Sequence, residues 1–202
     1  MKARVLSNLN LRANSVVIFT DADSMESHVR AIENLGTESG ISVLYLSCKN
    51  LNESTTTLPV WVINRVLELI LHRTRVGCGS PMAWLKYRKD NAAFELLVQR
   101  AGGQATVDNL NSFLAHNNSA IKKQIENLVE IEKKQFVLVV IGDFQEIPRE
   151  EQPVLAMMIH KLTKGASAYF RILSMNEPLV FRKDNLGEVG IQRDHDYIEI
   201  RA

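Results

Sequence analysis

The apolar positions of the chain fall into two kinds of pattern, and the first kind predicts strands. Five short runs are continuously or alternately apolar and rich in β-branched residues, which is typical of strands in a sheet buried on both faces. The most strand-like run covers residues 136–141, and we expect it to be the central strand. The other expected strands cover residues 16–19, 41–47, 169–174 and 197–200.

Apolar residues that recur every three or four positions predict helices between these strands. The expected helices cover residues 24–35, about 58–73, 81–101, about 106–134 with a break near 116–118, and 150–164. Ser80 and Pro81 have the residue types of an N-cap and a first helical position. Three of these helices follow one another without a strand, so we expect a helical insert over about 58–134.

Strands separated by helices define the fold class. The pattern predicts an α/β three-layer sandwich with a mainly parallel five-stranded sheet and a helical insert. A chain of 202 residues is long enough for one well-buried core, so we expect a single domain over 1–202.

Composition excludes several function classes without naming a partner. The 24 basic and 23 acidic residues nearly balance, which gives no overall field for wrapping nucleic acid. Cys48 and Cys78 lack metal-ligand spacing, and the histidines are scattered, so we expect no metal site and a reduced cytoplasmic compartment. No apolar run reaches the roughly 18 residues that cross a bilayer, so we expect no membrane association.

Candidate chemistry lies where the first strand turns into the first helix. In parallel sheets ligands bind beyond the carboxyl ends of strands, so loops 20–27, 142–148 and 175–181 are the ones that matter. The first of these loops holds three carboxylates and neither glycine nor lysine. Its residues are Thr20, Asp21, Ala22, Asp23, Ser24, Met25, Glu26 and Ser27.

Four stretches in order carry a family resemblance: 16–27, 136–148 with the sequence FVLVVIGDFQEIP, 169–178, and 192–200. Together they resemble the P-loop ATPases with an additional strand, in particular the AAA+ and STAND-like ATPases of prokaryotes. That resemblance implies a glycine-rich phosphate loop after the first strand and a pair of acidic residues after a later one. It also implies a polar sensor residue and an arginine before the last strand.

Residue by residue, this chain departs from the family pattern. Glu26 and Ser27 fall on the family's lysine and serine, with Thr20 and Met25 on its glycines, so only Ser27 matches. A carboxylate in place of the lysine repels a triphosphate by roughly 4 kcal/mol per charge pair at an effective dielectric constant near 20. We therefore expect no cofactor, with ATP and Mg²⁺ binding weakly or not at all.

The later motifs are also incomplete. Gly142 replaces the magnesium-holding aspartate, and the resemblance gives Asp143 the place of the water-activating acid. It gives Asn176 the place of the sensor and Arg193 that of the arginine that reaches a neighbour's γ-phosphate. These roles are vestigial. The resemblance implies a catalytically degenerate ATPase-like domain rather than an enzyme: a regulatory or assembly module that partners an active ATPase or another copy of itself.

Two other interpretations of the same residues stay open. The FTDADS stretch also resembles the opening of haloacid-dehalogenase-type phosphatases, in which Asp21 and Asp23 would be nucleophile and general acid/base with magnesium. Alternatively, Asp21, Asp23 and Ser24 simply cap a helix.

A basic cluster lies further along the chain. Lys86, Arg88 and Lys89, next to Trp84 and Tyr87, would suit nucleic acid, but a solvated helix face is the favoured interpretation.

Overall fold

The structure is a computed structural model that describes residues 12–38, 40–49, 57–175, 179–183, 189–193 and 195–201. The strands are β1 (Ser15–Phe19), β2 (Ile41–Ser47), β3 (Phe136–Gly142), β4 (Ala168–Met175), β5 (Arg182–Lys183), β6 (Val189–Gly190) and β7 (Ile198–Arg201). The helices are α2 (Ala22–Glu38), α3 (Leu58–Gly77), α4 (Pro81–Gly102), α5 (Val107–Glu132), the 3₁₀ turn η1 (Phe144–Glu146) and α6 (Gln152–Thr163).

Five parallel strands form one sheet in the order β2-β3-β4-β1-β7, which confirms the α/β fold class. The expectation that the 136–141 run is the central strand is wrong, because β4 occupies the middle and β3 lies next to the β2 edge. Both strands are buried on both faces, so their composition does not distinguish them. The short β5 and β6 pair antiparallel outside this sheet, in a segment for which the sequence predicted no strand.

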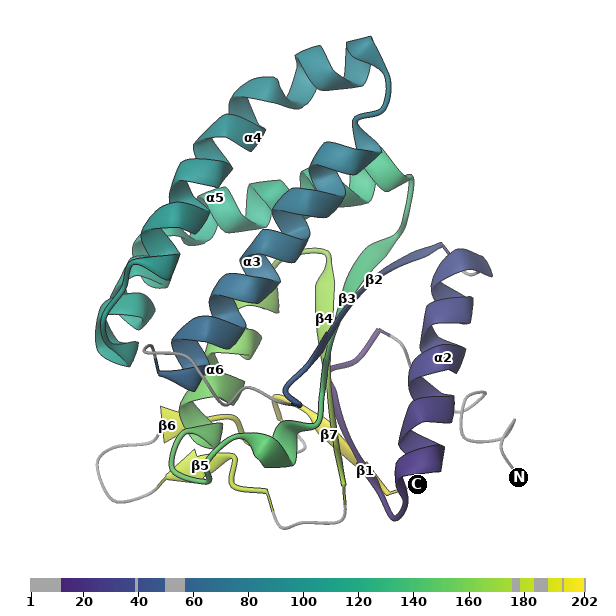
Figure 1. The fold of residues 1–202 in the computed structure, drawn as a ribbon, viewed down its shortest axis with the longest axis vertical. Coiled ribbons are helices and arrows are strands. Elements are labelled where there is room, and N and C mark those ends of the chain that lie inside the picture. The colour runs from purple at the N-terminus through teal and green to yellow at the C-terminus, as the bar shows by residue number, and fades with distance from the viewer. Residues whose placement is uncertain are drawn as a thin grey trace.

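Helices cover the two faces of the sheet unequally, giving the layers of a three-layer sandwich. Figure 1 shows α2 alone on one face and α3, α5 and α6 on the other, with α4 outside them. The larger apolar core lies between the sheet and the α3–α6 side, while a smaller one lies under α2. β1, β2, β3 and β4 therefore each present alternate residues to two separate cores.

The connection between β2 and β3 is made of three helices. Because β2 and β3 are parallel neighbours, the whole of α3, α4 and α5 forms one crossover. α3 and α5 contact strands, whereas α4 packs on α3 and α5. Whether this crossover is an insert relative to a simpler ancestor stays a prediction.

Several helix ends follow local chemistry, while α2, α5 and α6 differ from expectation. Ser80 caps α4 as expected, since its Oγ accepts from the Ala83 N–H at 3.2 Å. The expected break at 116–118 is wrong: α5 is continuous, with His116 Nδ1 2.7 Å from the Ser112 carbonyl and Asn117 donating to the Phe113 carbonyl. These polar side chains bond one turn back along the same helix instead of ending it. α2 begins at Ala22, two residues before the expected start, and ends at Glu38, three residues past the expected end. α6 begins at Gln152, two residues after the expected start.

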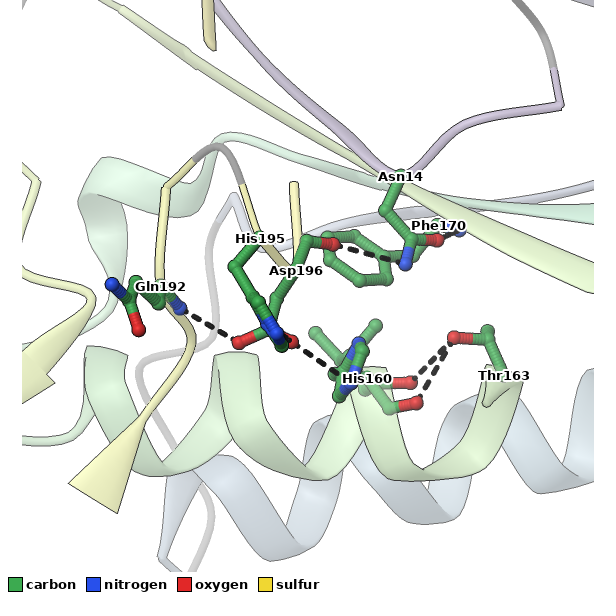
Figure 2. A network of polar contacts seen from close by, with 8 residues as sticks. Asn14, His160, Thr163, Phe170, Gln192, His195 and Asp196 are labelled. Atoms are coloured by element: carbon green, nitrogen blue, oxygen red, sulfur yellow. Dashed lines mark hydrogen bonds and ion pairs between the residues drawn. The ribbon is translucent and has the colours of Figure 1, made fainter. Parts of the chain in front are cut away.

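The two ends of the described chain meet at the amino-terminal edge of the sheet. Asn14 accepts a hydrogen bond from the Phe170 N–H through Oδ1 and donates to the Asp196 carbonyl, both at 3.1 Å. Asp196 in turn contacts His160 of α6 and His195, as Figure 2 shows. One asparagine thus links β1, β4 and the entry to β7.

None of the helices described here is long and apolar enough to cross a bilayer.

Candidate functional site

The turn between β1 and α2 is two residues long and is organised by Asp21. β1 ends at Phe19 and α2 begins at Ala22, so only Thr20 and Asp21 lie between them. The Asp21 carboxylate accepts from the Ser24 N–H at 2.7 Å and from the Ser24 hydroxyl at 2.8 Å. These are the bonds of an N-cap residue, so Asp21 caps the beginning of α2, in keeping with the capping interpretation.

The remaining positions of the expected phosphate loop lie inside α2. Ala22 through Ser27 form its first turns, and the Met25 N–H already points to the Asp21 carbonyl at 3.4 Å. Glu26 forms an exposed ion pair with Arg30 one turn later, with 2.5 Å between oxygen and nitrogen. Asp23 is exposed in the first turn of α2, where the helix dipole stabilises a carboxylate.

The second expected motif, at the end of β3, is closed by residues of β2. The Asp143 carboxylate is buried and accepts from the Ser47 hydroxyl at 2.5 Å. Its backbone has a positive φ of 55°, a left-handed conformation that aspartate adopts more readily than most residues. At Gly142 a Cβ would lie 2.7 Å from the hydroxyl oxygen of Tyr45. The Tyr45 ring therefore fills the space that a side chain at position 142 needs.

Burial and nearby negative charge keep the Cys48 thiol and the Tyr45 hydroxyl at this edge protonated. Burial, followed by Asp143 and Glu146, raises the pKa of the Cys48 thiol to about 12. Burial, followed by Asp143, also raises the pKa of Tyr45. Both groups are neutral at pH 7, so Cys48 has no nucleophilic thiolate and Tyr45 remains a hydrogen-bond donor.

A glutamine joins the third expected loop to the second. Gln145 Oε1, in η1, accepts from the Ser174 hydroxyl and from the Met175 N–H, each at 3.1 Å. The ends of β3 and β4 are held together by these two bonds. Asn176, to which the family resemblance gives the place of the sensor residue, lies outside the described residues.

Arg193 lies at the opposite edge of the sheet. It precedes β7, whose first residue pairs with Ser15 at the start of β1, so Arg193 is at the amino-terminal edge. Its guanidinium is 3.6 Å from the Glu199 carboxylate. The structure therefore does not bring Arg193 to Asp21 or Asp143 of the same chain.

The acidic residues at the ends of β1 and β3 lie apart in the sheet. β4 lies between β1 and β3, and two interstrand spacings separate the ends of these strands by about 10 Å. In the part of the chain that the structure describes, no group of three histidine, cysteine or acidic side chains is arranged to hold a metal ion. The phosphatase interpretation of Asp21 and Asp23 stays a prediction, with Asp21 bonded to Ser24.

Sequence reasoning missed the side chains of β2 and η1 that organise this edge. Tyr45 and Ser47 are two residues apart and so share a face of their strand. That alternation was visible in the sequence, but the pairing of β2 with β3 was needed to bring both residues to positions 142 and 143. Nothing local indicated that Gln145 would bond to the end of β4.

A scan against protein-family models gives no match for this chain, and neither does a search of curated proteins.

Proposed function

We propose that this chain is a catalytically degenerate ATPase-like domain that acts as a regulatory or assembly module. Its partner would be a competent ATPase or a second copy of the chain. The sheet order supports the ATPase-like part of the proposal, because β4 adds a strand between β1 and β3. This is in keeping with a P-loop ATPase that has an additional strand.

The short β1–α2 turn is the observation that carries the degeneracy. A phosphate loop binds by pointing successive backbone N–H groups inward, and a lysine meets the terminal phosphates. Here Ala22 to Ser27 are helical, the Ser24 N–H is bonded to the Asp21 carboxylate, and Glu26 stands where the lysine is expected. A triphosphate would meet carboxylates where the family offers N–H donors and a cation.

The packing at Gly142 supports the same conclusion independently. Because the Tyr45 hydroxyl lies 2.7 Å from where a Cβ would be, an aspartate at 142 requires the ring to move. An aspartate in the magnesium-holding place that the resemblance gives to position 142 would therefore collide with a tyrosine of the neighbouring strand.

The role in assembly is supported by an exposed apolar surface at the α3–α4 turn. It consists of Val76, Met82, Trp84 and Leu85, which are 65%, 81%, 49% and 61% exposed. Neighbouring exposed apolar side chains on a soluble domain commonly mark a protein interface. We call these four residues the α3–α4 surface.

Calorimetry tests the degeneracy. Purified protein is titrated with Mg·ATP and with ADP while a generic phosphate ester is assayed, with Asp21→Asn as the matched variant. We expect no heat of tight binding and no turnover. Sub-micromolar ATP binding with turnover would contradict the degeneracy, and magnesium-dependent ester hydrolysis abolished by Asp21→Asn would favour the phosphatase instead.

Sedimentation analysis tests the assembly role. We expect the chain to associate with itself as its concentration rises, or to associate with a competent ATPase that is mixed with it in the same sample. The double variant Met82→Glu, Leu85→Glu should remove this association because it places charges in the contact, whereas Gln99→Glu, exposed on the same helix, should not. Association that is identical in wild type and double variant would exclude the α3–α4 surface.

A further inference from the structure

A fully buried arginine lies under α2, away from the edge described above. Arg171 of β4 has no solvent exposure and pairs in register with Ser15, the first residue of β1. Its Nε donates to the Ser15 hydroxyl at 2.9 Å. Around it, the layer between α2 and the sheet is lined by apolar side chains such as Val17, Leu138 and Leu173.

The rest of this guanidinium is without a counter-charge among the described residues. Nη1 and Nη2 are buried and have no hydrogen-bond partner there. Burial alone lowers the pKa of Arg171 to about 10, with no contribution from a carboxylate. A buried cation without an ion pair, and with only its Nε hydrogen-bonded, costs the folded state several kcal/mol, and a bound anion would offset that cost.

A histidine of the covering helix is buried in the same layer. His28 is 5% exposed, its ring packs edge-on against Phe19 at 5.2 Å, and its Nε2 is buried without a partner in the described part of the chain. Phe19, on which the His28 ring packs, belongs to the same apolar layer under α2, and the charge of Arg171 adds to the effect of burial in lowering the pKa of His28. Among the described residues, three buried nitrogen atoms from these two side chains thus have no hydrogen-bond partner.

We propose that the layer between α2 and the sheet binds one small monovalent inorganic anion, of the charge and size of chloride, between Arg171 and His28. One fixed positive charge and apolar walls favour a monovalent anion over phosphate, since a second negative charge would be buried unpaired. The proposal is independent of the degenerate nucleotide site, because Arg171 pairs with the beginning of β1 whereas that site is beyond its end.

Thermal unfolding in different salts tests the proposal. At constant ionic strength, chloride is substituted for gluconate, which is too large to enter the layer. An anion that binds only the folded state should raise the melting temperature by a few degrees, in a manner that saturates with chloride concentration. A melting temperature that does not depend on the anion would overturn the proposal.

Two variants separate this site from general salt effects. Arg171→Met should abolish the chloride dependence, while Arg100→Met, which removes an exposed arginine of α4, should keep it. A chloride dependence that persists in Arg171→Met would place the anion elsewhere and contradict the proposal.

A crystal of the wild-type protein grown in bromide gives a second measurement that does not depend on any variant folding. We expect an anomalous peak within hydrogen-bond distance of Arg171 and His28. Its absence at a bromide concentration that saturates the thermal shift would also overturn the proposal.

Discussion

Individual side chains decide what each end of the sheet can bind. At the carboxyl edge, Tyr45 closes the space beside Gly142 and Asp21 is bonded to Ser24. Under α2, Nη1 and Nη2 of Arg171 and Nε2 of His28 are buried with no hydrogen-bond partner among the described residues. The degenerate nucleotide site and the anion site that we propose under α2 therefore concern different residues of the same sheet.

Replacing Gly142 with alanine should destabilise the protein by about 1–3 kcal/mol, because the added methyl group meets the Tyr45 ring. Chemical denaturation measures this loss. In the Tyr45→Leu background the same substitution should cost much less, which a double-mutant cycle would detect as a coupling energy. Gly103→Ala is the control, since its Cβ would make only ordinary contacts beyond 3.5 Å with backbone carbonyls.

Acidification should destabilise the protein through His28. Burial, with a smaller effect of Arg171, lowers the pKa of His28 from 6.5 to about 4. The unfolded chain therefore binds the proton first, so stability from this group is present above pH 6.5 and is lost as pH falls toward 4. His28→Leu should remove that part of the pH dependence of denaturation midpoints in gluconate buffer. A control at the exposed His116, His116→Gln, should retain it.

Secondary-structure elements were predictable where residue chemistry is local. All five strands of the main sheet appear near the expected positions, because apolar runs and capping residues are properties of neighbouring residues. The start of α2 was set two residues too late, because Asp21 could equally be a ligand or a cap until its bonds to Ser24 were known. Strand order, the Tyr45–Gly142 contact and the burial of Arg171 depend on pairing between distant segments, which no local pattern encodes.

The cap of α2 provides a direct test of how its first turn is held. Asp21→Ala should destabilise the protein by about 0.5–2 kcal/mol, because the Ser24 N–H loses its acceptor. Asp21→Asn should retain much of this stability, since asparagine also caps well. Equilibrium denaturation measures both variants. An equal loss for Asp23→Ala would show that charge near the helix end matters more than the cap.

At the scale of the whole molecule, Asn14 links segments that are far apart in sequence, at the amino-terminal edge of the sheet. Asn14→Ala removes the acceptor of the buried Phe170 N–H and the donor to the Asp196 carbonyl. We expect the free energy of unfolding to fall by about 1–3 kcal/mol. Hydrogen exchange should become faster than in the wild type, and the increase should be larger in β7 than in β3. Asn109→Ala, at an exposed position of α5, should leave both quantities unchanged.

The three-helix crossover also affects the order in which parts of the chain fold. β2 must pair with β3 in a register that joins Ile41 to Phe136, so the two strands meet only after a long chain segment is closed into a loop. Contacts among α3, α4 and α5 are closer in sequence and form at a smaller entropic cost. During refolding we expect amide protons of these helices to become protected in pulse-labelling experiments before those of β2. The bundle would then act as the template that brings the edge of the sheet together.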